Sequence, residues 1–348
     1  MAREYLASSP VGDPQFFGIV AFTQGEDPIE PLLMCSGLRV AVSDRDSADR
    51  FDLTPPVSDR GEHLEQGWVE VIDGVDLSVF PSERVAIVGE SASGKSLIVN
   101  GMFALMSAGT RTIGGKTTFA GSSFNPGGEE TVDTGGGAGF SSLEDRLAGT
   151  QLAEGSPEWM RTVGTQVGFV FQDPTASWNP LMYLGGQSGE ALGEHNDLSN
   201  EEIELRVLDA LGDVQLPKSR RFFRSTRRQF SAGQNQRAML AEALTRVPDL
   251  LVADEPFAGL DVSVAATIIE LLHDLQRKRG MALLVVTHDF GLVARIADRV
   301  VMVYAGQVVE IRSAIELFRS PRHPYTAGLL ASVPGLTDRR LEALRGEA

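Results

Sequence analysis

Two segments near the N-terminus have the residue pattern of β-strands. Leu32–Val42 and Trp68–Val79 are rich in apolar residues, and the second alternates as VEVIDGVDLSV. Alternation of this kind predicts strands with one buried face. Ser43–Gln66, which lies between them, is polar and charged. We therefore expect an antiparallel sheet that carries a long excursion.

Two shorter runs, Leu250–Ala253 and Ala282–Thr287, are apolar on both faces. Val264–Lys278, between them, has the apolar spacing of a helix. Strands of this type, connected by helices, are typical of a parallel sheet covered on its faces. The pattern therefore predicts an α/β fold with a parallel sheet in addition to the antiparallel one.

A helical region is expected before the first of these runs. Apolar residues recur at helical spacing in Asn200–Leu211, and Gln236–Leu244 continues the pattern. We place a helical subdomain at about residues 178–235.

Three segments lack a sustained apolar pattern. Residues 1–30 are rich in Pro, Gly and small residues, and Gly121–Gly139 reads GSSFNPGGEETVDTGGGAG. Such segments bury too little apolar surface to offset the entropy of ordering the chain. We expect a poorly ordered N-terminal extension, a flexible insertion and a short tail at 336–348, with the main domain at 31–335.

A glycine-rich loop lies between an apolar run, Arg84–Val88, and a helix-like stretch, Leu97–Met106. Its residues are Gly89, Glu90, Ser91, Ala92, Ser93, Gly94, Lys95 and Ser96, a G-x-x-x-x-G-K-[ST] pattern. Backbone N–H groups at a helix N-terminus cradle phosphate, Lys95 reaches the outer phosphates, and the Ser96 hydroxyl suits Mg²⁺. An ordinary glycine turn is the alternative, but it gives no reason for a position between strand and helix. The loop predicts binding of a nucleoside triphosphate.

Two adjacent carboxylates, Asp254 and Glu255, follow the apolar run Leu250–Ala253. Ligands bind at the carboxyl ends of strands in open parallel sheets. Hydrolysis of a phosphoanhydride needs a metal ion and an oriented water, so we assign Asp254 to Mg²⁺ and Glu255 to the water. Alternatively, the two carboxylates are only polar residues that follow the end of a strand and have no function.

Composition narrows the classes of protein. The chain has 348 residues, 42% hydrophobic residues, a net charge of −16 and one cysteine, Cys35. It shows no apolar run long enough to span a membrane, and we expect no secretory signal, internal disulfide or thiolate metal site. The acidic balance opposes nucleic-acid binding. One group of basic residues is either a solvated face or a contact to a partner or to phosphate. Its members are Arg220, Arg221, Arg224, Arg227 and Arg228.

Further motifs give the chain a resemblance to the ATP-binding cassette (ABC) ATPases. They are Val170–Pro174, Phe230–Gln234 (FSAGQ, where the family has LSGGQ), Ala258–Asp261 and Thr287–Asp289. The resemblance covers about Leu32 to Pro334. It implies a P-loop NTPase core with a parallel sheet, an antiparallel β subdomain and a helical signature subdomain.

The resemblance also implies roles for individual residues. Gln172 is similar to the Q-loop glutamine, which senses the γ-phosphate and helps to hold Mg²⁺ with Ser96 and Asp254; His288 resembles the switch histidine. Ser231, Ala232, Gly233 and Gln234 would contact ATP bound to a second ATPase subunit, and Asp261 would couple the two sites. The implied catalytic residues are Glu255, His288 and Gln172, with ATP and Mg²⁺ as ligands.

Two segments resemble the ATPase subunits of bacterial oligopeptide, dipeptide and nickel importers. These are Phe171–Pro180, FQDPTASWNP, and Arg322–Thr326, RHPYT. A plain turn is the alternative for the second. The expected function is ATP hydrolysis that energises such an importer at the cytoplasmic face of the plasma membrane. The expected partners are a second ATPase subunit, membrane permease subunits and, indirectly, an extracytoplasmic solute-binding protein.

The chain departs from the family pattern at several positions. Ala92 and Ala232 stand where the family has glycine, which either weakens nucleotide binding or is tolerated. Val42 stands where the family often stacks an aromatic ring on adenine, and Phe51 or Trp68 would substitute only if the excursion folds back. Trp178, at a commonly aliphatic position, packs in the core or contacts the permease. The cysteines that bind an iron–sulfur cluster in related subunits are absent, so no cluster is predicted.

Two other functions are alternatives to the importer ATPase. The two alanines motivate a nucleotide-gated partner subunit that binds ATP and hydrolyses it weakly. A soluble ABC protein of DNA repair or translation is disfavoured, because the sequence shows neither long coiled coils nor a second cassette, and its charge is acidic.

Overall fold

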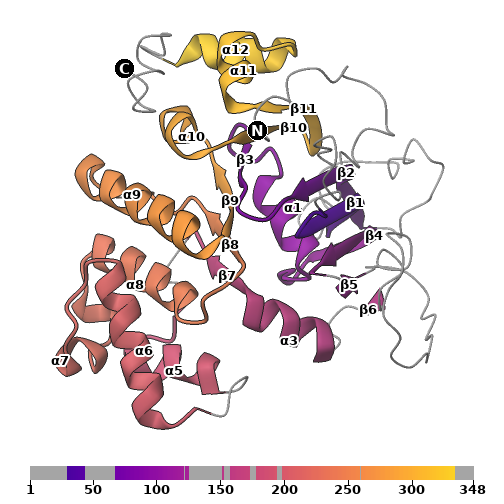
Figure 1. Ribbon diagram of the computed structural model, residues 1–348. Coiled ribbons are helices and arrows are strands. Elements are labelled where there is room, and N and C mark those ends of the chain that lie inside the picture. The colour runs from indigo at the N-terminus through magenta and orange to yellow at the C-terminus, as the bar shows by residue number, and fades with distance from the viewer. Residues whose placement is uncertain are drawn as a thin grey trace, which may run out of the picture. The chain divides into compact units, whose positions relative to one another are not determined.

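The computed structural model divides the chain into two compact units (Figure 1). Unit 1 comprises Met1–Phe80, Val88–Met160 and Val301–Ser332, and unit 2 comprises Pro81–Ile87, Arg161–Val300 and Val333–Ala348. The structure describes residues 30–43, 67–120, 122–124, 151–152, 157–172, 178–193, 198–258 and 260–333. The predicted N-terminal extension and C-terminal tail lie almost wholly outside these residues.

Unit 1 is built on a five-stranded sheet with the order β2-β1-β4-β5-β6. The strands are β1 (Leu33–Ser43), β2 (Trp68–Val79), β4 (Thr110–Phe119), β5 (Ser122–Phe124) and β6 (Gln151–Leu152). β1 pairs antiparallel with both β2 and β4, which confirms the predicted antiparallel sheet. β5 adds to β4 at the start of the predicted glycine-rich insertion, and residues 125–139 of that insertion lie outside the described residues.

The helix α1 (Lys95–Met102) packs closely on this sheet. Its buried residues include Ile98, Val99 and Met102. A Cβ added at Gly101 would come within 2.9 Å of a Val40 methyl group, so the helix approaches β1 at a distance that only glycine permits there. The close fit fixes the start of α1, and with it the glycine-rich loop that precedes it.

The C-terminal part of unit 1 consists of one strand pair and two helices. β10 (Arg299–Tyr304), which begins in unit 2, pairs with β11 (Gln307–Ser313), and α11 (Ala314–Arg319) and α12 (Pro324–Ser332) follow. The turn between β10 and β11 contains Gly306, whose carbonyl accepts a hydrogen bond from the Asp73 N–H of β2 at 3.4 Å. This turn is thereby attached to the first sheet.

Unit 2 contains a sheet with the order β10-β3-β9-β8-β7, to which β3 and β10 contribute their first residues. The strands are β3 (Arg84–Val88), β7 (Val167–Val170), β8 (Leu250–Asp254) and β9 (Ala282–Thr287). The pairs β7–β8 and β8–β9 are parallel, and the two apolar runs predicted the second of these pairs. All six residues of β9 are buried, which explains its continuous apolar sequence.

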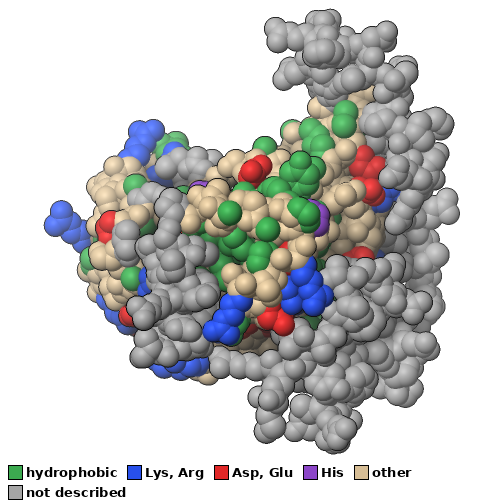
Figure 2. All heavy atoms as spheres, turned by 90° about the horizontal axis from the view of Figure 1, so that it is seen from above, with side chains coloured by type: hydrophobic (Ala, Val, Ile, Leu, Met, Phe, Trp, Pro, Cys, Tyr) green, Lys and Arg blue, Asp and Glu red, His purple; other side chains and the backbone are tan. Residues whose placement is uncertain are grey.

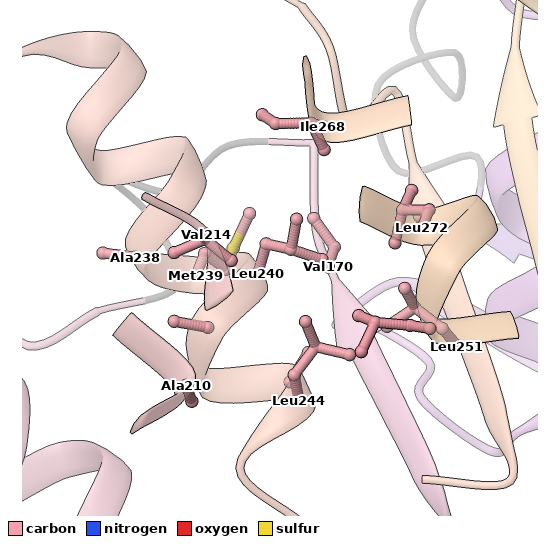
Figure 3. Close-up of a cluster of buried hydrophobic side chains, with 14 of the residues drawn as sticks. Val170, Ala210, Val214, Ala238, Met239, Leu240, Leu244, Leu251, Ile268 and Leu272 are labelled. Atoms are coloured by element: carbon pink, nitrogen blue, oxygen red, sulfur yellow. The ribbon is translucent and has the colours of Figure 1, made fainter. Parts of the chain in front are cut away.

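Seven helical elements lie wholly within unit 2 in its described residues. They are α5 (Leu184–Gly193), α6 (Asn200–Asp213), α7 (Arg220–Phe223), the 3-10 helix η3 (Arg227–Gln229), α8 (Ala232–Leu244), α9 (Val262–Arg279) and α10 (Phe290–Ile296). Those from α5 to η3 lie within the predicted helical subdomain at about 178–235, and α8 begins there. A further helix, α3 (Pro157–Gln166), runs from unit 1 into unit 2. Figure 3 shows Val170 and Leu251 of the sheet facing Leu240 and Leu244 of α8 and Leu272 of α9. One buried cluster therefore joins the strands to the helical subdomain.

Arg39 and Glu70 form a buried ion pair inside the first sheet. Arg39 Nε and Nη2 donate to the two Glu70 carboxylate oxygens at 2.7 and 3.0 Å, and the side chains are 7% and 10% exposed. Removing one partner of a buried pair leaves the other charge uncompensated, whereas removing both costs much less.

We expect Arg39→Met to lower the free energy of unfolding by about 3 kcal/mol or more, because Glu70 then stays buried without its cation. The double variant Arg39→Met/Glu70→Leu should recover most of that loss. Urea unfolding of the full chain measures both. A double variant less stable than Arg39→Met would show that the ion pair is not the source of the effect.

Candidate functional site

The glycine-rich loop is held tightly within unit 1. The Lys95 side chain is buried, and its Nζ donates to the carbonyl oxygens of Gly89 at 2.9 Å and Glu90 at 2.6 Å. The Ser93 N–H donates to the Glu90 carbonyl at 3.2 Å. The loop therefore wraps around the lysine ammonium group and ends at the N-terminus of α1. The helix begins at Lys95, two residues earlier than predicted, because Gly94 is its N-cap with φ of 100°.

The two substituted glycine positions differ in backbone conformation. Ala92 has φ of 64°, in the left-handed region that favours glycine. Ala232 does not have a positive φ, and it is the first residue of α8. Alanine in the left-handed region costs about 1 kcal/mol, and at the start of a helix it costs little. The expected strain therefore falls on Ala92, while Ala232 is tolerated.

In unit 2, three parallel strands end next to one another and carry the other predicted residues. Gln172 follows β7, Asp254 and Glu255 end or follow β8, and His288 follows β9. His288 Nδ1 lies 2.6 Å from Glu255 Oε1, and the His288 N–H donates to the same oxygen at 3.1 Å. The structure thus brings Glu255 and His288 into direct contact. Gln172 is exposed beside the end of β7.

Glu255 is held in an unusual backbone conformation. Its φ is 46°, and its N–H donates to the Val286 carbonyl of β9 at 2.9 Å. The other carboxylate oxygen accepts from Thr287 Oγ1 at 3.1 Å, and Thr287 Oγ1 accepts the Asp289 N–H at 3.1 Å. Backbone strain of this kind persists only where its surroundings enforce it, and it is common at functional sites. Thr287 was predicted only as part of a motif, and its contact with Glu255 depends on the pairing of β8 with β9.

The predicted signature residues form the N-terminus of α8. Ser231 Oγ accepts the Gln234 N–H at 3.3 Å, and Gln234 Oε1 accepts the Ser231 N–H at 3.0 Å, which is a capping box. Ser231 and Ala232 are exposed, and Gly233 and Gln234 are partly exposed. The first turn of this 13-residue helix contains no acidic residue, so the helix presents its positive end to solvent.

The predicted D-loop residue Asp261 caps α9. Its Oδ1 accepts from Ser263 Oγ at 2.6 Å and from the Val264 N–H at 2.9 Å, and these bonds lower the pKa of the Asp261 carboxyl. Gly259, in the same motif, lies outside the described residues. The structure therefore gives Asp261 a local role in ending the loop before α9.

Trp178 packs in the core of unit 2, as one of the two alternatives expected. It is 5% exposed and donates from Nε1 to Glu242 Oε2 at 2.5 Å. Glu242 lies on α8, and its burial raises the pKa of its carboxyl, against the hydrogen bond from Trp178. This partly buried carboxyl has no counterpart among the sequence predictions, because no local pattern marks a glutamate on the inner face of a helix.

The candidates for adenine stacking remain predictions. Val42 is partly buried on β1, and Trp68 pairs with Ser43 at the start of β2. The Arg111 guanidinium lies 4.2 Å from the centre of the Trp68 ring, so one face of the indole is covered. Phe51 lies outside the described residues.

The predicted basic group lies mostly on the surface of unit 2. Arg220, Arg221, Arg224 and Arg228 are exposed, and Arg220 pairs with Glu204 at 2.6 Å, which favours a solvated face. In Figure 2 the described Lys and Arg side chains lie in small groups among hydrophobic and acidic ones. None of the described helices has both the length and the apolar composition that crossing a bilayer requires.

Comparisons with known proteins agree with the motifs. A family model described as ABC transporter matches residues 72–258, and one described as the C-terminal region of oligopeptide/dipeptide transporters matches residues 309–348. A protein of Brucella ovis, provisionally named a peptide import ATP-binding protein, is 40% identical over 80% of this chain and 76% of its own length. The oligopeptide transport ATP-binding protein OppD of Bacillus subtilis is 38% identical over 80% of this chain and 70% of its own length.

Solved structures share the fold. The ATP-binding cassette MJ0796, in a dimeric post-hydrolysis state bound to ADP and Pi, matches with a TM-score of 0.57 at 23% identity. The match covers 79% of this chain and 98% of that one. CbiO1 from Clostridium perfringens, part of the transporter complex CbiONQ, also matches with a TM-score of 0.57, at 20% identity over 84% of this chain and 92% of its own.

We expect Ala92→Gly to stabilise the loop by about 0.5–1 kcal/mol, because glycine relieves the left-handed strain and loses part of that gain to unfolded-state entropy. Thermal unfolding with and without ATP measures the effect. Ala232→Gly is the matched control, and its right-handed helical position predicts no stabilisation. Equal effects of the two variants would contradict the assignment of strain to Ala92.

We expect Glu242→Gln to stabilise the chain relative to the parent by an amount that grows as the pH rises above the ordinary glutamate pKa of about 4.3. A carboxyl with a raised folded-state pKa favours folding below its unfolded pKa, and that contribution is lost as the pH rises through the folded pKa. Glutamine does not ionise and keeps an oxygen for the Trp178 N–H. Denaturation midpoints at a series of pH values above that ordinary pKa test the slope, with the exposed Glu190→Gln as control. A pH-independent difference would be contrary to this expectation.

Proposed function

Because the chain belongs to the ABC transporter family of ATPases, we propose that it is the ATP-hydrolysing subunit that energises an importer of oligopeptides or dipeptides. The relatives named for peptide import and the match to the oligopeptide/dipeptide C-terminal region support this class of cargo. The observation that carries the enzymatic assignment is the contact of Glu255 with His288 and Thr287 at the end of β8.

ATP is proposed to bind with its phosphates in the loop Gly89–Ser96. Backbone N–H groups at the start of α1 face the anion, and the Lys95 ammonium group, which the Gly89 and Glu90 carbonyls hold inside the loop, binds the outer phosphates. The loop is thus ready for an anion without a change of fold.

Ser96, Gln172 and Asp254 are proposed to hold Mg²⁺. All three present oxygen atoms, the donor type that this cation prefers. When bound, Mg²⁺ would neutralise charge on the phosphates.

Glu255 is proposed to accept a proton from the attacking water. Its carboxylate is fixed by hydrogen bonds from Thr287 and the His288 backbone, which leaves it little rotational freedom. His288 is 64% exposed on its side chain and sits on the same carboxylate oxygen, where it is placed to sense the γ-phosphate. Oriented water and a fixed base are what phosphoanhydride hydrolysis requires of the protein.

The exposed N-terminus of α8 is proposed to contact ATP held by a second ATPase subunit. Ser231, Gly233 and Gln234 would face its γ-phosphate, where the positive end of the helix favours an anion. Asp261, at the start of α9, would couple the two sites. The partner is either a second copy of this chain or a related cassette.

Exposed apolar residues on both sides of Gln172 in the sequence support docking of a membrane permease subunit. Phe171 is 41% exposed, Leu181 is 80% exposed and Tyr183 is 57% exposed, all in unit 2. Large apolar side chains in water indicate an interaction surface. The subunit would then act as a peripheral protein at the cytoplasmic face of the plasma membrane, with an extracytoplasmic solute-binding protein delivering cargo to the permease.

Glu255→Gln is expected to lower kcat for ATP hydrolysis by about 100-fold or more, while ATP affinity changes by less than about threefold, because the base is lost and the loop is intact. The measurement is steady-state turnover and ATP binding by the full chain, alone and with its partner and permease subunits. Lys95→Ala is the binding-defective control. Turnover indifferent to Glu255 would reject the hydrolytic role and identify a nucleotide-gated partner instead.

A further inference from the structure

A tyrosine near the C-terminus touches the glycine-rich loop. The Tyr325 hydroxyl of α12 accepts a hydrogen bond from the Glu90 N–H at 3.1 Å. Both residues belong to unit 1, although 235 positions separate them in sequence. The contact therefore joins the RHPYT segment to the loop that the proposed function assigns to ATP.

The hydrogen bond falls on a peptide group that Lys95 also uses. The Glu90 N–H and the Gly89 carbonyl are the two ends of one planar peptide. Lys95 Nζ donates to that carbonyl at 2.9 Å. Because the peptide is planar, fixing its N–H with Tyr325 also fixes the direction of the carbonyl that faces the lysine.

Tyr325 is itself held by its neighbours. The buried Glu310 of β11 accepts the N–H groups of Arg322 and His323 at 2.8 and 3.0 Å. His323 Nδ1 in turn accepts the Tyr325 N–H at 3.2 Å. The Tyr325 ring lies 4.4 Å from the ring of Tyr304, measured between centroids. These contacts set the direction of the hydroxyl before any ligand binds.

The strand pair β10–β11 supports the loop at two further points. A Cβ at Gly89 would lie 2.2 Å from the Val303 carbonyl oxygen, so the first loop residue lies directly against β10. The Gly306 N–H donates to the Ser93 carbonyl at 3.0 Å. Three residues from the C-terminal part of unit 1 therefore contact the loop. Tyr325 does so through its side chain, and Val303 and Gly306 do so through their backbone.

We propose that Tyr325 is a positioning residue for ATP, which orients the Gly89–Glu90 peptide and thereby the Lys95 ammonium group. The proposal rests on the proposed function, in which Gly89–Ser96 binds the phosphates. It also gives the RHPYT segment a role beyond that of a turn. Glu310 and His323 set the start of α12, and Tyr325 connects that helix to the loop.

The expected effect follows from preorganisation. Without the hydroxyl, the Gly89–Glu90 peptide gains freedom, and a smaller fraction of the loops has the geometry that binds phosphate. Apparent affinity falls in proportion to that fraction. Loss of one hydrogen bond of ordinary strength corresponds to a change of about three- to tenfold.

The test compares Tyr325→Phe with Tyr304→Phe in the full chain, with binding of a fluorescent ATP analogue as the readout. Tyr325→Phe keeps the ring and its packing but removes the hydroxyl, and it should weaken binding about three- to tenfold. Tyr304→Phe, which keeps the other ring of the pair, should bind within about twofold of the parent. In the assembled complex, Tyr325→Phe should raise KM for ATP and leave kcat at saturation within about twofold.

Three results would overturn the proposal. They are parental affinity in Tyr325→Phe, tighter binding in that variant, and equal weakening in both variants, which would assign the effect to ring packing. If parental affinity is accompanied by a fall in thermal stability without ATP, the contact of Tyr325 is purely structural. Lys95→Ala distinguishes a wrong role for Tyr325 from a wrong nucleotide site. If Lys95→Ala binds ATP normally, the loop is not the nucleotide site and the proposed function fails.

Discussion

The buried ammonium group of Lys95 is the constraint on which unit 1 depends. A cation that is taken out of water must be surrounded by oriented dipoles, and here the carbonyls of Gly89 and Glu90 supply them. Carbonyls point inward only if the loop doubles back before α1, and this requires left-handed backbone at Ala92 and Gly94. The residues that contact the loop stabilise this reversal of the chain direction.

Those supports come from segments distant in sequence. Ile72 of β2 leaves no room for a side chain at Gly94, and Val303 of β10 leaves none at Gly89. Gly306 and Tyr325 hold the loop from the C-terminal side. The strain at Ala92 is therefore maintained by packing around the loop rather than by the loop sequence. A substitution that would unfold an isolated turn can persist here because its surroundings leave no other arrangement.

Much of the fold was predictable because it is encoded locally. The bounds of β2, β3 and β9 agree with the apolar patterns, since burial on one or both faces fixes the residue type at successive positions. The conformation of the two alanines was not predictable. Ala92 and Ala232 occupy comparable positions in glycine motifs, yet only Ala92 has positive φ, because φ depends on how the chain continues into the loop or the helix. The hydrogen bond of Tyr325 with Glu90 was equally out of reach, since it depends on the path of the whole unit.

Within unit 2, the strained backbone of Glu255 and its side-chain contacts form one arrangement. The Glu255 N–H is fixed to the Val286 carbonyl of β9, and its carboxylate is fixed by Thr287 and His288 at the end of the same strand. Backbone strain persists only where the surroundings enforce it, and here β9 and the residue that follows it supply these contacts. Under the proposed function, a movement of His288 toward a γ-phosphate would therefore also move the proposed base, because the His288 ring and backbone both contact one oxygen of the Glu255 carboxylate.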